Sequence, residues 1–190
     1  MNKIRAVFDE GTITVYQAYN VLIAESAVHF QKFDFPSFKK DRMTWIKPSF
    51  CWMMYRSGWA TKKDQERVLA IKIKRHGFDW ALRHSCLSHF DPLLYSTYEE
   101  WKQKLKVAPV RIQWDPERDI NLNQLKTRAI QIGLSDISVH KYIQDWTVEI
   151  TDITVICREI KCLIDQNKTI EAKEFLPKEI IYPFPSIGSQ

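Results

Sequence analysis

Alternating apolar and polar positions mark the first structural segment of the chain. Residues 12–19, TITVYQAY, alternate in this way and are rich in β-branched side chains, which predicts a strand. Asn20 then stands where a helix N-cap is expected, and apolar residues recur at helical spacing over residues 21–33. The pattern therefore predicts a strand that leads directly into a helix.

The same order of strand and helix recurs further along the chain. Residues 42–47 predict a second strand that Pro48 ends, and helical spacing continues from Pro48 to Gly58. After a polar loop, residues 67–75 end in strict apolar and basic alternation, which predicts a third strand with a cationic outward face. The remaining short elements that we expect are helices over 78–90 and 95–106 and strands over 110–114 and 128–134.

The last third of the chain carries the longest periodic pattern. From Ser135 to Leu163, apolar residues recur at intervals of three or four, which predicts a long C-terminal amphipathic helix that packs on the sheet. The proline-rich residues 169–190 predict a surface tail. We therefore expect an α+β fold with one globular domain over residues 1–168 and a mixed central sheet flanked by helices.

The composition is typical of a soluble globular protein, with 190 residues of which 45% are hydrophobic and 27% charged. The four cysteines form no CxxC pair, which favours reduced thiols in the cytoplasm, and the spacing of His84 and His89 does not suit a metal site. The sequence has no apolar run of the roughly 18 to 20 residues that span a bilayer. We expect no metal and no membrane partner.

Positive charge is concentrated in one part of the chain. The net charge is +5, yet residues 39–75 alone hold eleven lysines and arginines against three acidic residues. Localised positive charge favours an anionic partner such as RNA or DNA, although it is also compatible with a solvated face.

Within this basic region, residues 42–59 alternate cationic and aromatic side chains. The residues are Arg42, Trp45, Lys47, Trp52, Arg56 and Trp59. Such a surface can stack bases or a nicotinamide on tryptophan and hold phosphate with arginine or lysine. An aromatic core edge with long cationic stems would give the same pattern, so both interpretations stay open.

Candidate catalytic groups are few. Asp64 and Glu66 precede a predicted strand, and Asp115, Glu117 and Asp119 follow another. The chain has no P-loop, no GxGxxG and no GxSxG motif. Kinase, dinucleotide-fold dehydrogenase and α/β-hydrolase chemistry are therefore disfavoured.

Several strings in the chain resemble a known family. RAVxxxxTITVYQAY, RMTWIKPSF, WMMYRSGWA, QERVLAI and RAIQIGL, between Arg5 and about Trp146, are similar to the family of domain of unknown function 4291. This resemblance implies membership and carries no established reaction.

A second resemblance is to the ADP-ribosyltransferase fold, and it rests on the order of strand, helix and a glutamate before the third strand. It implies NAD as cofactor, Glu66 as the catalytic group on the ribose, and an NAD site formed by Tyr16, Gln17, Arg42, Trp45, Lys47 and Ser49. The first strand has Tyr16 and Gln17 where such enzymes carry an arginine or histidine. Nucleic acid would be the acceptor, contacted by Arg56, Trp59, Lys72 and Lys74.

Two other functions remain open at this stage. A non-catalytic module would bind RNA or DNA with the same tryptophans and cations. A small-molecule sensor or structural partner protein would instead bury the tryptophans. The sequence does not determine the oligomeric state.

Overall fold

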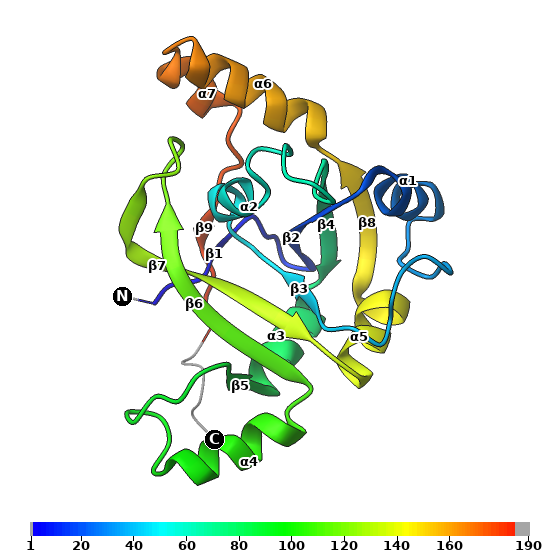
Figure 1. Ribbon diagram of the computed structural model, residues 1–190, viewed down its shortest axis with the longest axis vertical. Helices are drawn as coiled ribbons and strands as arrows, with labels where there is room; N and C mark the ends of the chain where they lie inside the picture. The colour runs from blue at the N-terminus through cyan, green and yellow to red at the C-terminus, as the bar shows by residue number, and fades with distance from the viewer. Residues whose placement is uncertain (1, 185–190) are drawn as a thin grey trace.

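Two sheets form the frame of the molecule in the computed structural model, which describes residues 2–184 (Figure 1). One sheet has the strand order β2–β4–β8 and the other the order β3–β7–β6–β5. Their bounds are β2 Thr12–Tyr19, β3 Thr44–Ile46, β4 Arg67–Lys74, β5 Ser85–Leu87, β6 Val110–Arg118, β7 Gln124–Leu134 and β8 Thr147–Asp152. The expected α+β domain is confirmed, but the expected single central sheet is replaced by these two sheets and a separate two-stranded sheet of β1 (Arg5–Ala6) and β9 (Ile180–Ile181).

The two sheets meet at one point beside the second strand. Tyr16 in β2 and Lys47, just after β3, exchange backbone hydrogen bonds of 2.7 Å and 3.2 Å between nitrogen and oxygen. Strand β3 otherwise pairs with β7, with Trp45 opposite Gly133. This bridge therefore joins the two sheets, while the rest of β3 belongs to the sheet of β7.

Helix α1 (Val21–Phe30) begins where the sequence predicts but ends three residues before residue 33, and helix α2 (Phe50–Ser57) begins two residues after Pro48 and ends before Gly58. The side chain of Asn20 accepts a hydrogen bond from the Ile23 backbone N–H, and Ser49 caps α2 through the N–H of Trp52. Gly58 ends α2 in the left-handed region with φ of 59°, a conformation that glycine adopts without steric cost.

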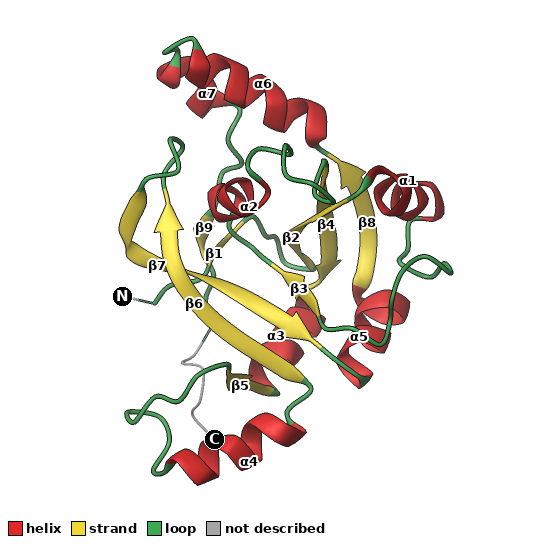
Figure 2. Ribbon diagram, viewed as in Figure 1, coloured by secondary structure: helices red, strands yellow, loops and turns green. Residues whose placement is uncertain are grey.

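The other helices lie around the sheets (Figure 2). They are α3 (Arg75–Arg83), α4 (Tyr98–Val107), α5 (Ile137–Lys141), a π-helical turn over Tyr142–Trp146, α6 (Thr154–Asp165) and α7 (Thr169–Glu174). Helix α3 packs closely on the π-helical turn, as Gly77 shows: a Cβ at this residue would lie only 2.4 Å from the Cγ of Trp146. No helix within residues 2–184 combines the length and the apolar character needed to cross a bilayer.

The predicted helix over 78–90 is wrong in its second half. Helix α3 ends at Arg83, and residues 85–87 form β5, which pairs in parallel with β6. The strand predicted over 110–114 continues to Arg118, with an irregular pairing near Pro116. It forms a long hairpin with β7, which is visible on the left of Figure 1.

The long C-terminal helix is also wrong. Residues 147–152 form β8, which divides the predicted helix into α5 with its π-helical turn and α6. Strand β8 pairs with β4 and sets Ile150 opposite Ile71. The physical reason is that Thr147, Ile150 and Thr151 are β-branched, and that β4 needs a partner along its second edge.

Residues 169–182, which we expected to form a surface tail, belong to the folded domain. Helix α7 packs against α6 with Ala172 buried, and β9 (Ile180–Ile181) pairs with β1 (Arg5–Ala6). Tyr182 is only 3% exposed. Its hydroxyl donates to Asp79 Oδ1 at 2.6 Å, which ties the end of the described chain to α3. The last part of the predicted tail, residues 185–190, lies outside the described residues.

Candidate ligand-binding cleft

A cleft of about 420 Å³ lies where the two sheets meet. We call it the Lys47 cleft, and the side chains that define it are Gln17, Lys39, Arg42, Trp45, Lys47 and Arg56. Five of these six residues are among those predicted as site residues. The structure therefore brings together residues from β2, the loop before β3, β3 itself and α2.

Local backbone geometry explains this grouping. Trp45 and Lys47 are two residues apart on an extended segment, so their side chains point to the same side. Arg56 reaches the cleft from the last turn of α2. Trp45 lies over Gly133 of β7, where an added Cβ would be 2.9 Å from the tryptophan Cζ2. The missing side chain at Gly133 leaves the space that the Trp45 ring occupies.

The Lys47 cleft is strongly cationic. It is lined by Lys39, Arg42, Lys47 and Arg56, and no described aspartate or glutamate lines it. Lys39, Arg42 and Arg56 are exposed, and none of them forms an ion pair within 4.0 Å with a described carboxylate. Unpaired cations around a concave surface favour an anionic ligand.

Lys47 differs from the other three cations because it is buried. Its side chain lines the cleft, the residue is 7% exposed, and Nζ donates a hydrogen bond of 2.9 Å to the Trp45 carbonyl. Burial and, to a smaller extent, the neighbouring Arg56 guanidinium lower the pKa of Lys47 to about 7, while Asp115 acts in the opposite direction. A large fraction of Lys47 is therefore neutral at physiological pH.

Gln17 has its side-chain hydrogen bonds satisfied by the protein. Its Nε2 donates to Thr44 Oγ1 at 2.9 Å, and its Oε1 accepts from the Tyr142 hydroxyl at 2.7 Å. Gln17 therefore holds β2 against β3 at the cleft wall, and a ligand would compete with these bonds.

The structure places other predicted site residues away from the cleft. Tyr16 and Trp59 are buried and pack edge-on against Phe50. Trp59 is 2% exposed, so its ring offers no surface for stacking a base. It turns inward because the chain reverses at Gly58.

Glu66 lies next to the cleft residue Gln65 but does not itself line the cleft. Its Oε1 accepts a hydrogen bond of 2.9 Å from the Asp64 backbone N–H, while its Oε2 is buried without a hydrogen-bond partner. The carboxylate predicted to be catalytic is thus adjacent in sequence to a cleft residue but does not line the cleft.

Lys72 and Lys74 are on β4 and are not part of the cleft. Lys72 pairs with Glu149 and Lys74 with Asp145, each at 2.7 Å between nitrogen and oxygen. Both ion pairs bind β4 to the segment around β8 and neutralise the strand face that the sequence predicts as cationic.

Comparison with known proteins places the chain in a family. A family model described as domain of unknown function (DUF4291) matches residues 3–182. The chain belongs to the DUF4291 family. The match includes β1 and β9, so the family unit extends beyond the segment that the sequence strings cover. No curated protein matches the chain.

A second cavity of this DUF4291 chain contains Ser49, another predicted site residue. It measures about 790 Å³ and lies between α2, the β6–β7 hairpin and the α7–β9 segment. Ser49 Oγ donates to Glu117 Oε1 at 2.8 Å, and Glu179 Oε1 accepts from the Phe50 N–H at 2.6 Å. Burial raises the pKa of Glu117, and it raises the pKa of Glu179 to about 7.

The sequence gives unequal signals for these additional residues. Lys39 is in the basic window, and Glu117 is one of the acidic residues after the strand at 110–114. The sequence around Glu179 does not mark it as a site residue. Glu179 reaches Ser49 and Phe50 only because the segment before β9 folds back against α2.

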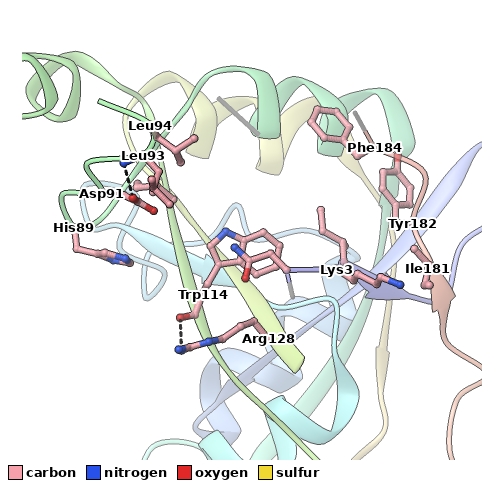
Figure 3. A pocket seen from close by; sticks show the side chains of 13 residues that line it. Lys3, His89, Asp91, Leu93, Leu94, Trp114, Arg128, Ile181, Tyr182 and Phe184 are labelled. Atoms are coloured by element: carbon pink, nitrogen blue, oxygen red, sulfur yellow. Dashed lines mark hydrogen bonds between the residues drawn. The ribbon is translucent and has the colours of Figure 1, made fainter. Parts of the chain in front are cut away.

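A third cavity, of about 570 Å³, lies beside the paired chain ends. Figure 3 shows Trp114 projecting into it, with Arg128, Lys3 and Tyr182 around the opening and His89 further away. None of the predicted site residues lines this cavity. Among residues 2–184, no three histidine, cysteine, aspartate or glutamate side chains are placed to hold a metal ion.

Proposed function

We propose that the protein binds a nucleotide by its phosphates in the Lys47 cleft, and that NAD is this nucleotide. The observation that carries the proposal is the convergence of three exposed cations, Lys39, Arg42 and Arg56, on one cleft without an acidic residue among its described lining residues. Arginine side chains bind phosphate through paired charge-assisted hydrogen bonds. Arg42 and Arg56, which are exposed and without ion-pair partners among the described residues, would hold the phosphates.

Two further features support a nucleotide over a simple anion. Trp45 is half-buried and lines the cleft, and an indole is a side chain on which a flat ring would stack. The volume of about 420 Å³ is within the usual range for small-molecule sites. The residues present therefore fit the phosphates and one ring of NAD.

The reaction proposed for this site is transfer of ADP-ribose to an anionic acceptor, with nucleic acid as the leading class. NAD supplies the ADP-ribosyl group, with nicotinamide as the leaving group. A carboxylate near the ribose would stabilise the positive charge that develops on it. Glu66 is the proposed carboxylate, since its Oε2 has no hydrogen-bond partner and its neighbour Gln65 lines the cleft.

The position of Glu66 also favours a second candidate function. Because this side chain does not line the cleft, the same cations and Trp45 would serve a module that binds RNA or DNA without chemistry. Such binding weakens steeply as salt rises, because phosphate contacts release counterions.

The deciding experiment uses isotope-labelled NAD with separate pools of RNA, DNA and protein. We expect nicotinamide release and label on a nucleic-acid pool, and we expect Glu66→Gln to abolish transfer while NAD still binds. Arg42→Gln and Arg56→Gln should each weaken NAD binding at least tenfold. Lys63→Gln is the matched control, since Lys63 is exposed and does not line the cleft.

Each alternative outcome identifies a different error. Tight, salt-sensitive oligonucleotide binding without nicotinamide release would support the binding module and remove Glu66 from a catalytic role. Binding of neither NAD nor oligonucleotide would reject the cleft as a nucleotide site.

A further inference from the structure

Lys47 is the most unusual ionisable group in the cleft, because it is buried without a carboxylate partner. Its Nζ makes one hydrogen bond, to the Trp45 carbonyl, although an ammonium group has three donors. No described carboxylate forms an ion pair with it within 4.0 Å. Burial of an unpaired charge is unfavourable, so this environment favours the neutral amine.

A neutral lysine amine is a nucleophile. At pH 7 the pKa of about 7 leaves roughly half of Lys47 as free amine. A lysine with the reference pKa of about 10.4 has a free-amine fraction about a thousandfold smaller at this pH. Desolvation beside another cation is a recognised way to activate lysine towards carbonyl compounds, and Arg56 is the neighbouring cation here.

The same property makes Lys47 a poor permanent anchor for phosphate. The exposed side chains of Arg42, Arg56 and Lys39 already surround the opening of the cleft, and arginine keeps its charge at every physiological pH. The cleft thus separates two tasks. Three exposed cations are suited to hold an anion, and one buried amine lines the same cleft.

We propose that Lys47 forms an imine with an aldehyde or ketone that carries a phosphate group, and that Arg42 and Arg56 hold this phosphate. This inference rests on the proposed function only in placing phosphate in the Lys47 cleft. It adds a covalent step and a substrate class that nucleotide binding does not require.

The chemical step is balanced without a further reactant. The lone pair of the neutral Lys47 amine attacks the carbonyl carbon, and the carbonyl electron pair moves to oxygen. The nitrogen loses both protons as the C=N bond forms. The oxygen takes up two protons and leaves as water. The reaction is a reversible condensation in which nothing is oxidised or reduced.

The test uses pyridoxal 5′-phosphate as the probe, because it joins an aldehyde to a phosphate. The full-length protein is incubated with the probe at pH 7, reduced with borohydride, digested and mapped by mass spectrometry. We expect the reduced adduct on Lys47 to form at least tenfold faster than on the exposed Lys63. Pyridoxal, which lacks the phosphate, should label Lys47 at least tenfold more slowly than pyridoxal 5′-phosphate does.

Variants separate reactivity from phosphate binding. Lys47→Met should remove the adduct while the exposed Lys63 reacts as before. Arg42→Gln should slow labelling of Lys47 by the phosphorylated probe and leave labelling by pyridoxal unchanged. Lys63→Arg should leave the labelling rate of Lys47 unchanged.

Two results would overturn the inference. Labelling of Lys47 no faster than that of Lys63 would show that the buried amine is only a structural donor to the Trp45 carbonyl. Equal labelling by pyridoxal and pyridoxal 5′-phosphate would reject the phosphate-bearing substrate class. NAD binding without selective labelling of Lys47 would support the proposed function and reject the imine. Selective labelling without NAD binding would support the imine and reject NAD as the ligand.

Discussion

At the scale of single residues, the cleft depends on side chains whose neighbours make room for them. Trp45 lies over Gly133, and a Cβ there would be 2.7 Å from Met43 Sδ and 2.9 Å from Trp45 Cζ2. The thioether of Met43 is flexible and can move, whereas the indole is rigid. A methyl group at Gly133 would therefore displace the Trp45 ring.

We expect Gly133→Ala to weaken NAD binding at least fivefold, because stacking of a base on an aromatic ring contributes about 1 to 3 kcal/mol. Titration followed by tryptophan fluorescence measures this affinity. Gly11→Ala is the control, since a Cβ there would meet only Asp9 Oδ1 at 3.9 Å. Unchanged binding by Gly133→Ala would exclude Trp45 from the ligand site.

The pKa of Lys47 makes its effect on stability depend on pH. The folded state lowers this pKa to about 7 from 10.5, so the unfolded state binds more protons between these two values. The free-energy cost of burying the charged amine is complete below pH 7 and disappears as the pH rises towards 10.5. We expect Lys47→Met to raise the free energy of unfolding by roughly 2 to 4 kcal/mol at pH 6 and by much less at pH 10. Urea unfolding at the two pH values measures the difference, and an equal effect at both would contradict the burial argument.

Part of the cleft could be predicted from the sequence, because the spacing of its residues determines on which side of the backbone each side chain lies. Trp45 and Lys47 share one side of an extended segment, and this two-residue spacing is visible in the sequence. Trp59 belongs to the same aromatic and basic stretch of the sequence, but the left-handed turn at Gly58 directs its ring into the core. The direction of the Glu66 side chain depends on the backbone N–H of Asp64, which itself has a positive φ of 60°. The sequence around Asp64 does not predict this backbone conformation.

At the scale of elements, the first turn of α2 is held by a carboxylate from the far end of the chain. Glu179 Oε1 accepts from the Phe50 N–H, one of the backbone donors that an α-helix leaves unpaired at its start. Glu117 accepts from Ser49, the N-cap of the same helix, and Arg5 Nε lies 4.0 Å from Glu179 Oε2. Two acidic groups and one arginine therefore fix the helix that carries Arg56.

This arrangement predicts a second pH effect of opposite sign. Burial raises the pKa of Glu179 to about 7 from 4.5, so the folded state binds more protons between these values and loses stability as the pH rises through them. Glu179→Gln retains an oxygen for the Phe50 N–H. We expect it to raise the free energy of unfolding by roughly 1 to 3 kcal/mol at pH 8 and to have little effect at pH 4.5. Thermal unfolding at both pH values is the measurement, and destabilisation at pH 8 would show that the charged form is needed.

Element boundaries were predictable where local signals agreed. Asn20, Ser49 and Gly58 bear capping chemistry, and the alternation in β2 and β4 is long enough to identify strands. The segment 146–153 is compatible with both periods, because Trp146, Ile150 and Ile153 have helical spacing and Val148 and Ile150 are two residues apart, as on one face of a strand. Pairing with β4 decides between them, and that contact spans more than seventy residues.

At the scale of the whole molecule, the cleft lies where the two sheets are joined by the Tyr16–Lys47 bridge. The ends of the described chain close the opposite side, where β1 pairs with β9 and Tyr182 packs on Phe8 and Phe78. Arg75 Nε donates to the Tyr182 hydroxyl at 3.1 Å. These long-range contacts explain why residues 169–182 are part of the domain despite their polar, proline-containing sequence.

Tyr182 provides a test of this closure. We expect Tyr182→Ala to lower the free energy of unfolding by roughly 3 to 5 kcal/mol, because it removes a buried ring together with the hydrogen bonds to Asp79 and Arg75. Ile180→Ala in the preceding strand β9 is the control, since Ile180 is exposed and should change stability by less than about 1 kcal/mol. If Tyr182→Ala lowered the urea midpoint as little as Ile180→Ala is expected to, residues 180–182 would be dispensable for the fold.

The pairing of β1 with β9 has a consequence for how the protein is made. A ribosome releases β1 into solution long before it has synthesised residues 180–182, so a nascent chain carries Ile4 and Phe8 without their final neighbours until those residues emerge. Asp79 and Arg75 likewise lack the tyrosine that joins them until that point. The domain can close only after residues 180–182 have left the ribosome, and until then the unpaired strand β1 is the segment that a chaperone would meet.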